Sequence, residues 1–244
     1  MAELTWGSDA VDAEPFTLRG AGGAPIDGFH ARPEGPVRSG IVVHPDIGGL
    51  RPLFEDLARR LASHGFAVAV FEPFGRLPAD ERAAMDLDAR MEAVRGLVDS
   101  EQLGDMTSAA DELVARDEVS TVSALGFCLG GMYVLKAAAT GRFDRAASFY
   151  GQLEVPENWR GPGLEEPLAT AADVCPTIAI LGGRDHFTPP DDIQALRDAW
   201  ADRPDCEIVF YPDAEHGFVH DPDRPAHRDA DAADAWRRVF EFLA

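Results

Sequence analysis

The stretch Val119-Ser-Thr-Val-Ser-Ala-Leu-Gly-Phe-Cys-Leu-Gly-Gly131 decides the fold of this chain. Its first part is β-branched and apolar up to Gly126, and a helix-forming run starts just beyond Cys128. This pattern predicts a β-strand, a tight turn and a helix, with a thiol at the turn. Gly126 and Gly130 flank the cysteine, and their missing β-carbons let backbone segments approach closely around a strained bend. The bend is expected to push the sulfur out of the fold towards a substrate.

Two later residues complete this pattern, because each follows a short hydrophobic, strand-like run. Asp185 ends the stretch 178–185, and His216 ends the stretch 209–216. The order nucleophile, acid, histidine is the chain order of the catalytic triad in α/β-hydrolases, and other folds with the same triad geometry use other orders. We therefore predict that Cys128 is the nucleophile, that His216 is the general base and that Asp185 orients the histidine.

The length and composition predict one α/β domain over residues 1–244. The chain is 45% hydrophobic, which is enough for one sizeable core. Strands that alternate with helices imply an α/β-hydrolase-like, mostly parallel sheet with helices on both faces. Residues 1–15 are acidic and do not resemble a signal peptide, and no run reaches the ~18 apolar residues of a membrane helix. We expect a cytoplasmic monomer.

The charge and the cysteines exclude several classes of partner. A formal net charge of -21 predicts that nucleic acid and anionic membranes are repelled. Either adaptation to high salt or a genomic bias explains this acidity, and we favour the bias. The three cysteines have no metal-ligand spacing, and Cys175 and Cys206 are interpreted as small core hydrophobes. We predict no metal and no cofactor, since His and Cys do not cluster and no phosphate loop or dinucleotide fingerprint is present.

Three segments away from the nucleophile have recognisable patterns. Residues 15–31 alternate in polarity around a glycine-rich turn, which predicts a hairpin at the antiparallel edge of the sheet. The region 77–117 is rich in alanine and acidic residues, and we predict two helices separated near Gly104. Segment 151–173 contains several prolines and glycines and is expected to form part of the wall of the cleft.

The predicted topology supplies the other groups that acyl transfer needs. The backbone N–H groups of Ile47 and Leu129 are predicted to form the oxyanion hole, because one follows the strand before the first main helix and the other follows the nucleophile. A free thiol has a pKa near 8.5 and needs activation, for which the helix N-terminus at Leu129 and His216 are the candidates. Because a thiolate leaves faster than an ordinary alkoxide, hydrolysis is expected mainly for activated esters, enol lactones or thioesters.

Five motifs in register resemble the dienelactone hydrolase family over nearly the whole chain. They are His44-Pro-Asp-Ile-Gly-Gly-Leu50, Phe71-Glu-Pro-Phe-Gly-Arg76, Gly126-Phe-Cys-Leu-Gly-Gly131, Gly182-Gly-Arg-Asp-His-Phe187 and Glu215-His-Gly-Phe218. The resemblance implies a cysteine hydrolase of dienelactone-like enol lactones, with Cys128, Asp185 and His216 as its triad. In the family, a glutamate beside the oxyanion loop holds the resting thiol, and Asp46 occupies that position here.

The family also implies two arginines that bind the carboxylate of the substrate. Arg76 matches one of them, and the second falls at His220. A neutral histidine binds a carboxylate less well than a bidentate guanidinium does. Three alternatives stay open: His220 is protonated in use, Arg51 substitutes for the arginine, or the substrate is not the dicarboxylate-type lactone of the family. A different class of function also stays open, namely a non-hydrolytic protein whose reactive thiol serves redox sensing or ligand binding.

Overall fold

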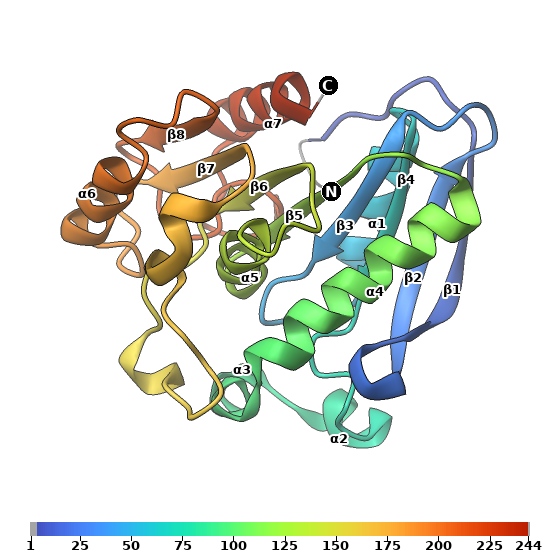
Figure 1. Ribbon diagram of the computed structural model, residues 1–244, viewed down its shortest axis with the longest axis horizontal. Coiled ribbons are helices and arrows are strands. Elements are labelled where there is room, and N and C mark those ends of the chain that lie inside the picture. Colours follow the sequence, from blue (N-terminus) through green and yellow to red (C-terminus); the bar gives the residue numbers. More distant parts are fainter. Residues whose placement is uncertain (1–3, 244) are drawn as a thin grey trace.

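The computed structural model describes residues 4–243 and contains, within them, one eight-stranded sheet in the order β1-β2-β4-β3-β5-β6-β7-β8 (Figure 1). The strands are β1 (Val11–Arg19), β2 (Pro25–Pro33), β3 (Ser39–His44), β4 (Phe66–Phe71), β5 (Val122–Phe127), β6 (Arg145–Phe149), β7 (Thr177–Gly182) and β8 (Cys206–Tyr211). β1 pairs antiparallel with β2, and β2 pairs antiparallel with β4. All other pairings are parallel. The predicted hairpin at the antiparallel edge is therefore confirmed.

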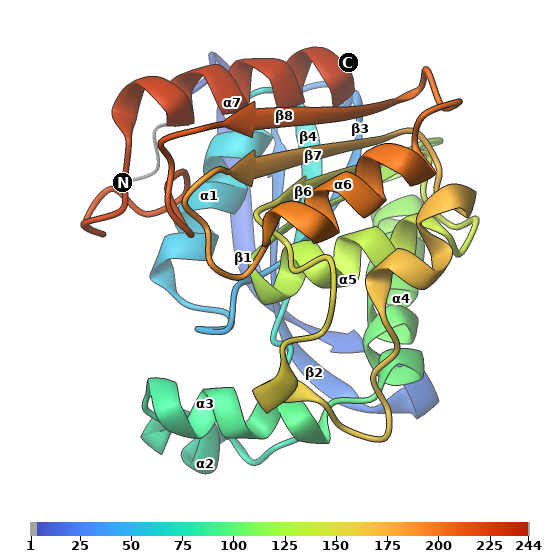
Figure 2. The ribbon, with the colours of Figure 1, turned by 90° about the vertical axis from the view of Figure 1, so that its left-hand side faces the viewer.

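Helices cover both faces of this sheet, as predicted. The α-helices are α1 (Pro52–Ala62), α2 (Ala79–Ala84), α3 (Leu87–Ala93), α4 (Asp99–Asp117), α5 (Leu129–Ala138), α6 (Pro190–Ala199) and α7 (Asp229–Leu243), and short 3-10 turns lie at Ala21–Gly23, Val94–Gly96, Glu157–Trp159 and Pro167–Asp173. Helices α4 and α5 lie on one face, and α1 and α7 lie on the other (Figure 1). Helices α2 and α3 stand beyond one end of the sheet (Figure 2).

The central strands are apolar because water reaches neither face of them. Every residue of β4, β5 and β7 is buried, as expected of parallel strands between two helix layers. The edge strand β1 is exposed at most positions. Among residues 4–243, no helix is both long and apolar enough to cross a membrane.

The predicted helix break near Gly104 is wrong. Helix α4 runs through Gly104 without interruption, and the breaks come earlier in the chain, before Asp86 and between residues 93 and 99. The carboxylate of Asp86 accepts a hydrogen bond from the backbone N–H of Ala89 and so caps α3. A β-carbon at Gly104 would lie 2.7 Å from the β-carbon of Ala21. This glycine therefore allows the hairpin turn to pack on the helix.

The turn from β5 into α5 requires two glycines. A β-carbon at Gly130 would lie 2.0 Å from the carbonyl oxygen of His44, and one at Gly126 would lie 2.4 Å from the carbonyl oxygen of Gly130. Both obstacles are backbone atoms, which cannot turn aside as a side chain can. The close approach therefore holds the start of α5 against the end of β3.

We expect Gly130→Ala to lower the free energy of unfolding by about 1–3 kcal/mol, because the added methyl group overpacks a rigid backbone contact. Urea denaturation followed by circular dichroism measures this loss. Gly96→Ala is the matched control, since a β-carbon there meets no atom within 4 Å, and it should change stability by less than about 0.5 kcal/mol. Equal stability of the two variants would contradict the proposed role of Gly130.

Candidate active site

Cys128 occupies a strained turn between β5 and α5. Its backbone has φ 56° and ψ -119°, and it is the residue immediately before the first residue of the helix. Its N–H donates to the carbonyl oxygen of Phe149 at 3.0 Å. Positive φ is costly for a residue with a β-carbon and is concentrated at functional sites. The predicted strand, turn and helix are thus confirmed. Cys128 as a whole residue is only 7% exposed, so the turn does not push it out of the fold as expected.

The carboxylate of Asp185 holds the ring of His216. Asp185 follows β7 and His216 follows β8, so the two loops meet at the carboxyl end of the parallel sheet. His216 Nδ1 donates to Asp185 Oδ2 at 2.7 Å, and the other carboxylate oxygen accepts the N–H of Phe187 at 2.9 Å. Because a carboxylate only accepts, Nδ1 carries the proton. The other ring nitrogen, Nε2, is buried and has no hydrogen-bond partner within residues 4–243.

His216 also interacts with Cys128. Burial by itself would lower the pKa of His216, but the electrostatic interaction with Cys128 and the hydrogen bond to Asp185 outweigh burial and raise this pKa to about 10. The three side chains selected from the sequence are therefore gathered in one cluster. Their catalytic roles stay a prediction at this point.

Gln152 is a neighbour of the thiol that the sequence did not suggest. It lies three residues beyond β6, it is fully buried, and its Nε2 donates to Cys128 Sγ at 3.6 Å. A single glutamine belongs to no chemical motif. The signal that was available is its place after a buried strand of the parallel sheet, at the same edge as the nucleophile.

Asp46 is engaged with Arg51 and His220. The guanidinium of Arg51 binds both carboxylate oxygens at 2.6 and 2.9 Å, and His220 Nε2 donates at 2.8 Å. Burial by itself would raise the pKa of Asp46, but the hydrogen bonds and charges of these partners hold this pKa well below its usual range. Within residues 4–243 the carboxylate also accepts the N–H of Gly48, and no hydrogen bond joins it to Cys128. Its predicted action on the thiol stays a prediction.

His220 is a neutral link in this network. Burial lowers its pKa, although Asp46 opposes the shift. Since Nε2–H donates to Asp46, Nδ1 is the acceptor for the hydroxyl group of Tyr150. Tyr150 itself has φ 40°, a second strained backbone position near the nucleophile.

The residues predicted to bind a substrate carboxylate are all occupied. Arg51 is paired with a carboxylate, and both ring nitrogens of His220 have partners. Arg76 binds Asp105 at 2.5 and 3.0 Å and lies 3.3 Å from Glu101. Arg76 also lines a pocket of about 600 Å³ beside α2, α3 and the start of α4. The substrate-binding roles of these residues stay predictions.

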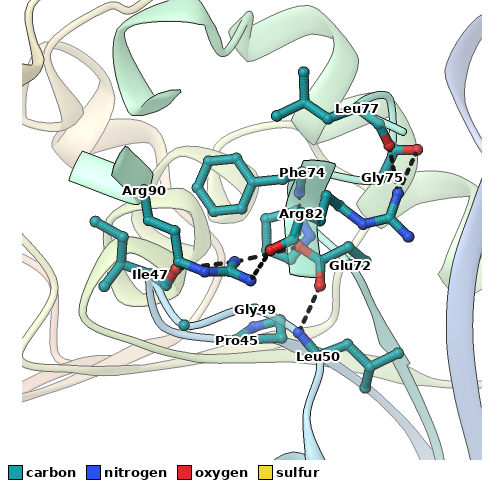
Figure 3. A network of polar contacts seen from close by, with 12 residues as sticks. Pro45, Ile47, Gly49, Leu50, Glu72, Phe74, Gly75, Leu77, Arg82 and Arg90 are labelled. Carbon is teal, nitrogen blue, oxygen red and sulfur yellow. Dashed lines mark hydrogen bonds and ion pairs between the residues drawn. The ribbon is translucent and has the colours of Figure 1, made fainter. Parts of the chain in front are cut away.

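A buried carboxylate supports the loop 45–50, which includes the predicted oxyanion donor. Glu72 Oε2 accepts the N–H of Leu50 at 2.9 Å, and Glu72 Oε1 accepts the N–H of Phe74 at 3.0 Å (Figure 3). Burial raises the pKa of Glu72. Gly49, with φ 69°, leaves room for this carboxylate, which would lie 2.5 Å from a β-carbon there. The signal in the sequence was an acidic residue directly after a fully apolar strand.

Arg90 connects the same loop to helix α3. It donates to the carbonyl oxygen of Ile47 at 3.5 Å and lies 4.0 Å from Glu72 Oε1 (Figure 3). On the other side, the close contact of Gly130 with His44 brings this loop to the start of α5. The N–H of Leu129 belongs to the first helical turn, where N–H groups have no acceptor inside the helix. The two predicted oxyanion donors therefore come from segments that lie side by side.

Groups of three or more His, Cys, Asp or Glu side chains that could hold a metal ion are absent from residues 4–243.

Comparisons with known proteins agree with this architecture. Residues 26–244 match the model of the dienelactone hydrolase family. The chain belongs to this family. An Escherichia coli K12 protein named "Putative carboxymethylenebutenolidase" is 31% identical over 96% of this chain and 88% of its own length. The carboxymethylenebutenolidase of Rhodococcus opacus is 29% identical over 92% of this chain and 88% of its own length.

A solved structure supports the same assignment. The "Putative Dienelactone Hydrolase" of Klebsiella pneumoniae superimposes with a TM-score of 0.86 at 26% identity, covering 96% of this chain and 99% of that one. The predicted family, the α/β-hydrolase fold and the class of ester hydrolase are therefore confirmed for this dienelactone hydrolase family member.

The raised pKa of His216 predicts a loss of stability at high pH. The raised pKa stabilises the folded state, and this stabilisation is complete below pH 6.5, the ordinary pKa of histidine. It is lost as the pH rises through about 10. We expect the difference in free energy of unfolding between wild type and His216→Gln to shrink over that range. Urea denaturation at a series of pH values measures it, with His186→Gln, an exposed neighbour, as the control. A difference that does not change with pH would contradict the assignment.

Proposed function

We propose that this protein hydrolyses activated esters or enol lactones through an acyl-thioester on Cys128. The observation that carries the proposal is the cluster of three side chains: Asp185 holds His216 at 2.7 Å, and His216 interacts with Cys128. The cluster lies at a strained turn that opens a helix, where the helix dipole favours a negative sulfur. An oriented imidazole beside a thiol is the arrangement that nucleophilic catalysis requires.

The proposed reaction has two halves. The raised pKa of His216 favours a resting pair in which His216 Nε2 already holds the proton of the Cys128 thiol. The thiolate sulfur attacks the ester carbonyl carbon, whose oxygen becomes an oxyanion held by the N–H groups of Ile47 and Leu129. The C–O bond to the leaving group then breaks, and His216 returns the proton to that oxygen. In the second half, His216 takes a proton from water, and the hydroxide attacks the thioester carbon. The C–S bond then breaks, which releases the carboxylic acid and restores the thiolate beside protonated His216.

The leaving group limits the substrates. The tetrahedral intermediate can expel either the sulfur or the alcohol oxygen, and the group of lower pKa leaves faster. An enolate or phenolate competes with a thiolate far better than an alkoxide does. Family relatives bear the names dienelactone hydrolase and carboxymethylenebutenolidase, and these names support a lactone of the activated kind. Water is the second substrate, and no step requires a cofactor.

We expect Cys128→Ala to lower kcat/KM for 4-nitrophenyl acetate by at least about a thousandfold, because the triad acts as a unit. Release of 4-nitrophenolate measures turnover. Mass spectrometry of the acid-quenched wild-type reaction should show one acetyl group on Cys128. Cys175→Ala, a partly buried cysteine before β7, is the control and should keep the activity. Turnover that survives Cys128→Ala unchanged would refute the proposal. A reactive Cys128 without an acyl-enzyme on any ester would favour the thiol-sensing alternative.

A further inference from the structure

Gln152 holds a buried hydrogen-bond acceptor without a partner beside the nucleophile. Its Nε2 donates to Cys128 Sγ at 3.6 Å, whereas its Oε1 is buried and has no hydrogen-bond partner within residues 4–243. The residue is 0% exposed. Native proteins rarely leave a buried polar atom unpaired, because such an atom has lost water and gained nothing. What sets this amide apart is that its other end contacts the sulfur of Cys128, so its oxygen is a candidate for contact with a bound acyl group.

The carboxamide is held in a fixed place. Gly151 packs so closely on the first turn of α5 that a β-carbon there would lie 2.3 Å from the carbonyl carbon of Gly131. On its other side, Tyr150 N–H donates to the carbonyl oxygen of Ile180 at 2.8 Å. The segment that bears Gln152 is thus fixed between α5 and β7. Preorganised groups of this kind recognise a ligand without losing further freedom on binding.

The free acceptor lies close to the site where an acyl group would form. Nε2 and Oε1 of Gln152 belong to one planar amide, and Nε2 touches the sulfur that would carry the acyl carbon. A carbonyl oxygen only accepts hydrogen bonds, so its complement is an O–H or N–H group. Of an acyl group bound to this sulfur, the position next to the carbonyl carbon would be the part nearest to the amide.

The arginines around the site offer little to a negative substrate. Four of them are each paired with a carboxylate: Arg51 with Asp46, Arg76 with Asp105, Arg82 with Asp27 and Arg90 with Glu72 (Figure 3 shows the last). A substrate carboxylate would have to break one of these pairs, and it would first have to approach a chain of net charge -21.

Arg224 is the exception near the site. Its guanidinium has no carboxylate partner within 4.0 Å among residues 4–243, and it lies so close to Gly217 that a β-carbon there would meet it at 2.6 Å. Its charge contributes to the lowered pKa of His220. Arg224 is therefore the residue on which recognition of an anion would depend. Its substitution tests the alternative that the substrate is negatively charged.

We infer that the acyl group of the natural substrate is uncharged and carries a hydroxyl or amide N–H next to the ester carbonyl, which donates to Gln152 Oε1. The inference rests on the proposed function, since the acyl group in question is the one bound to Cys128. Gln152 then acts as a catalytic residue that touches both the sulfur and the substrate. Selection depends on a hydrogen bond and not on an ion pair.

Two 4-nitrophenyl esters test the hydrogen bond. Hydroxyacetate and methoxyacetate withdraw electrons similarly, but only the first has a donor. Each kcat/KM is divided by the rate constant for hydroxide-catalysed hydrolysis of the same ester. We expect this normalised value in wild type to be at least about tenfold higher for hydroxyacetate than for methoxyacetate, because one ordinary hydrogen bond contributes a factor of that size. In Gln152→Met the ratio should fall to about 1. Gln194→Met, on the exposed side of α6, should keep it. Because each ratio compares two esters on the same protein, a difference in folded fraction between the variants does not affect it.

A second pair tests the charge. We expect 4-nitrophenyl methyl succinate to exceed 4-nitrophenyl hydrogen succinate in normalised kcat/KM by at least about tenfold at low ionic strength, where surface charges are least screened. A preference for the hydrogen succinate that disappears in Arg224→Gln would overturn the uncharged class and assign anion binding to that arginine.

The outcomes separate the two proposals. Equal normalised values for the first pair, or a preference for methoxyacetate, would overturn the role of Gln152 while ester hydrolysis by Cys128 still stands. A ratio that survives in Gln152→Met would overturn it equally. If none of the four esters is turned over and no acyl-enzyme forms, the proposed function fails and the inference fails with it.

Discussion

The start of helix α5 approaches the end of strand β3 so closely that no side chain fits between them. A β-carbon at Gly130 would lie 2.0 Å from the carbonyl oxygen of His44, and the chain can reach this position only through a sharp turn at Cys128, with φ 56°. That turn leaves the sulfur at the carboxyl end of the sheet. It also sets the first N–H groups of the helix beside the loop that follows β3, so the nucleophile and the predicted oxyanion donors depend on one contact.

Three buried carboxylates near this contact differ in role because they differ in partners. Asp185 accepts a ring N–H and orients His216. Asp46 faces a guanidinium and a neutral histidine, so that its charge is balanced inside the network. Glu72 accepts two backbone N–H groups and shapes the loop. Environment, and not residue type, decides which carboxylate orients a histidine, which balances a cation and which supports a loop.

The sequence predicted those features that are encoded over short distances. Cys128, Asp185 and His216 each follow an apolar strand, and parallel strands bring such positions to one edge of the sheet. The pairing of Asp46 with His220, 174 residues apart, arises only when the chain is folded. Gly104 was misjudged for a related reason: its local preference is to break a helix, whereas its contact with Ala21 is a tertiary requirement. Gln152 was missed because an amide gains meaning only from its neighbours.

The neutral ring at position 220 affects how the site can discriminate between substrates. With His220 neutral, the pair of Asp46 and Arg51 cancels to zero net charge, and no cation in that network is left over for an anion. In the proposed role of Gln152, selection then depends on a hydrogen bond. This selection can be stringent, because an analogue that lacks the donor leaves a buried acceptor such as Gln152 Oε1 unpaired. Within the network of Asp46, Arg51 and His220, the positive charge of Arg51 is therefore fully used by Asp46.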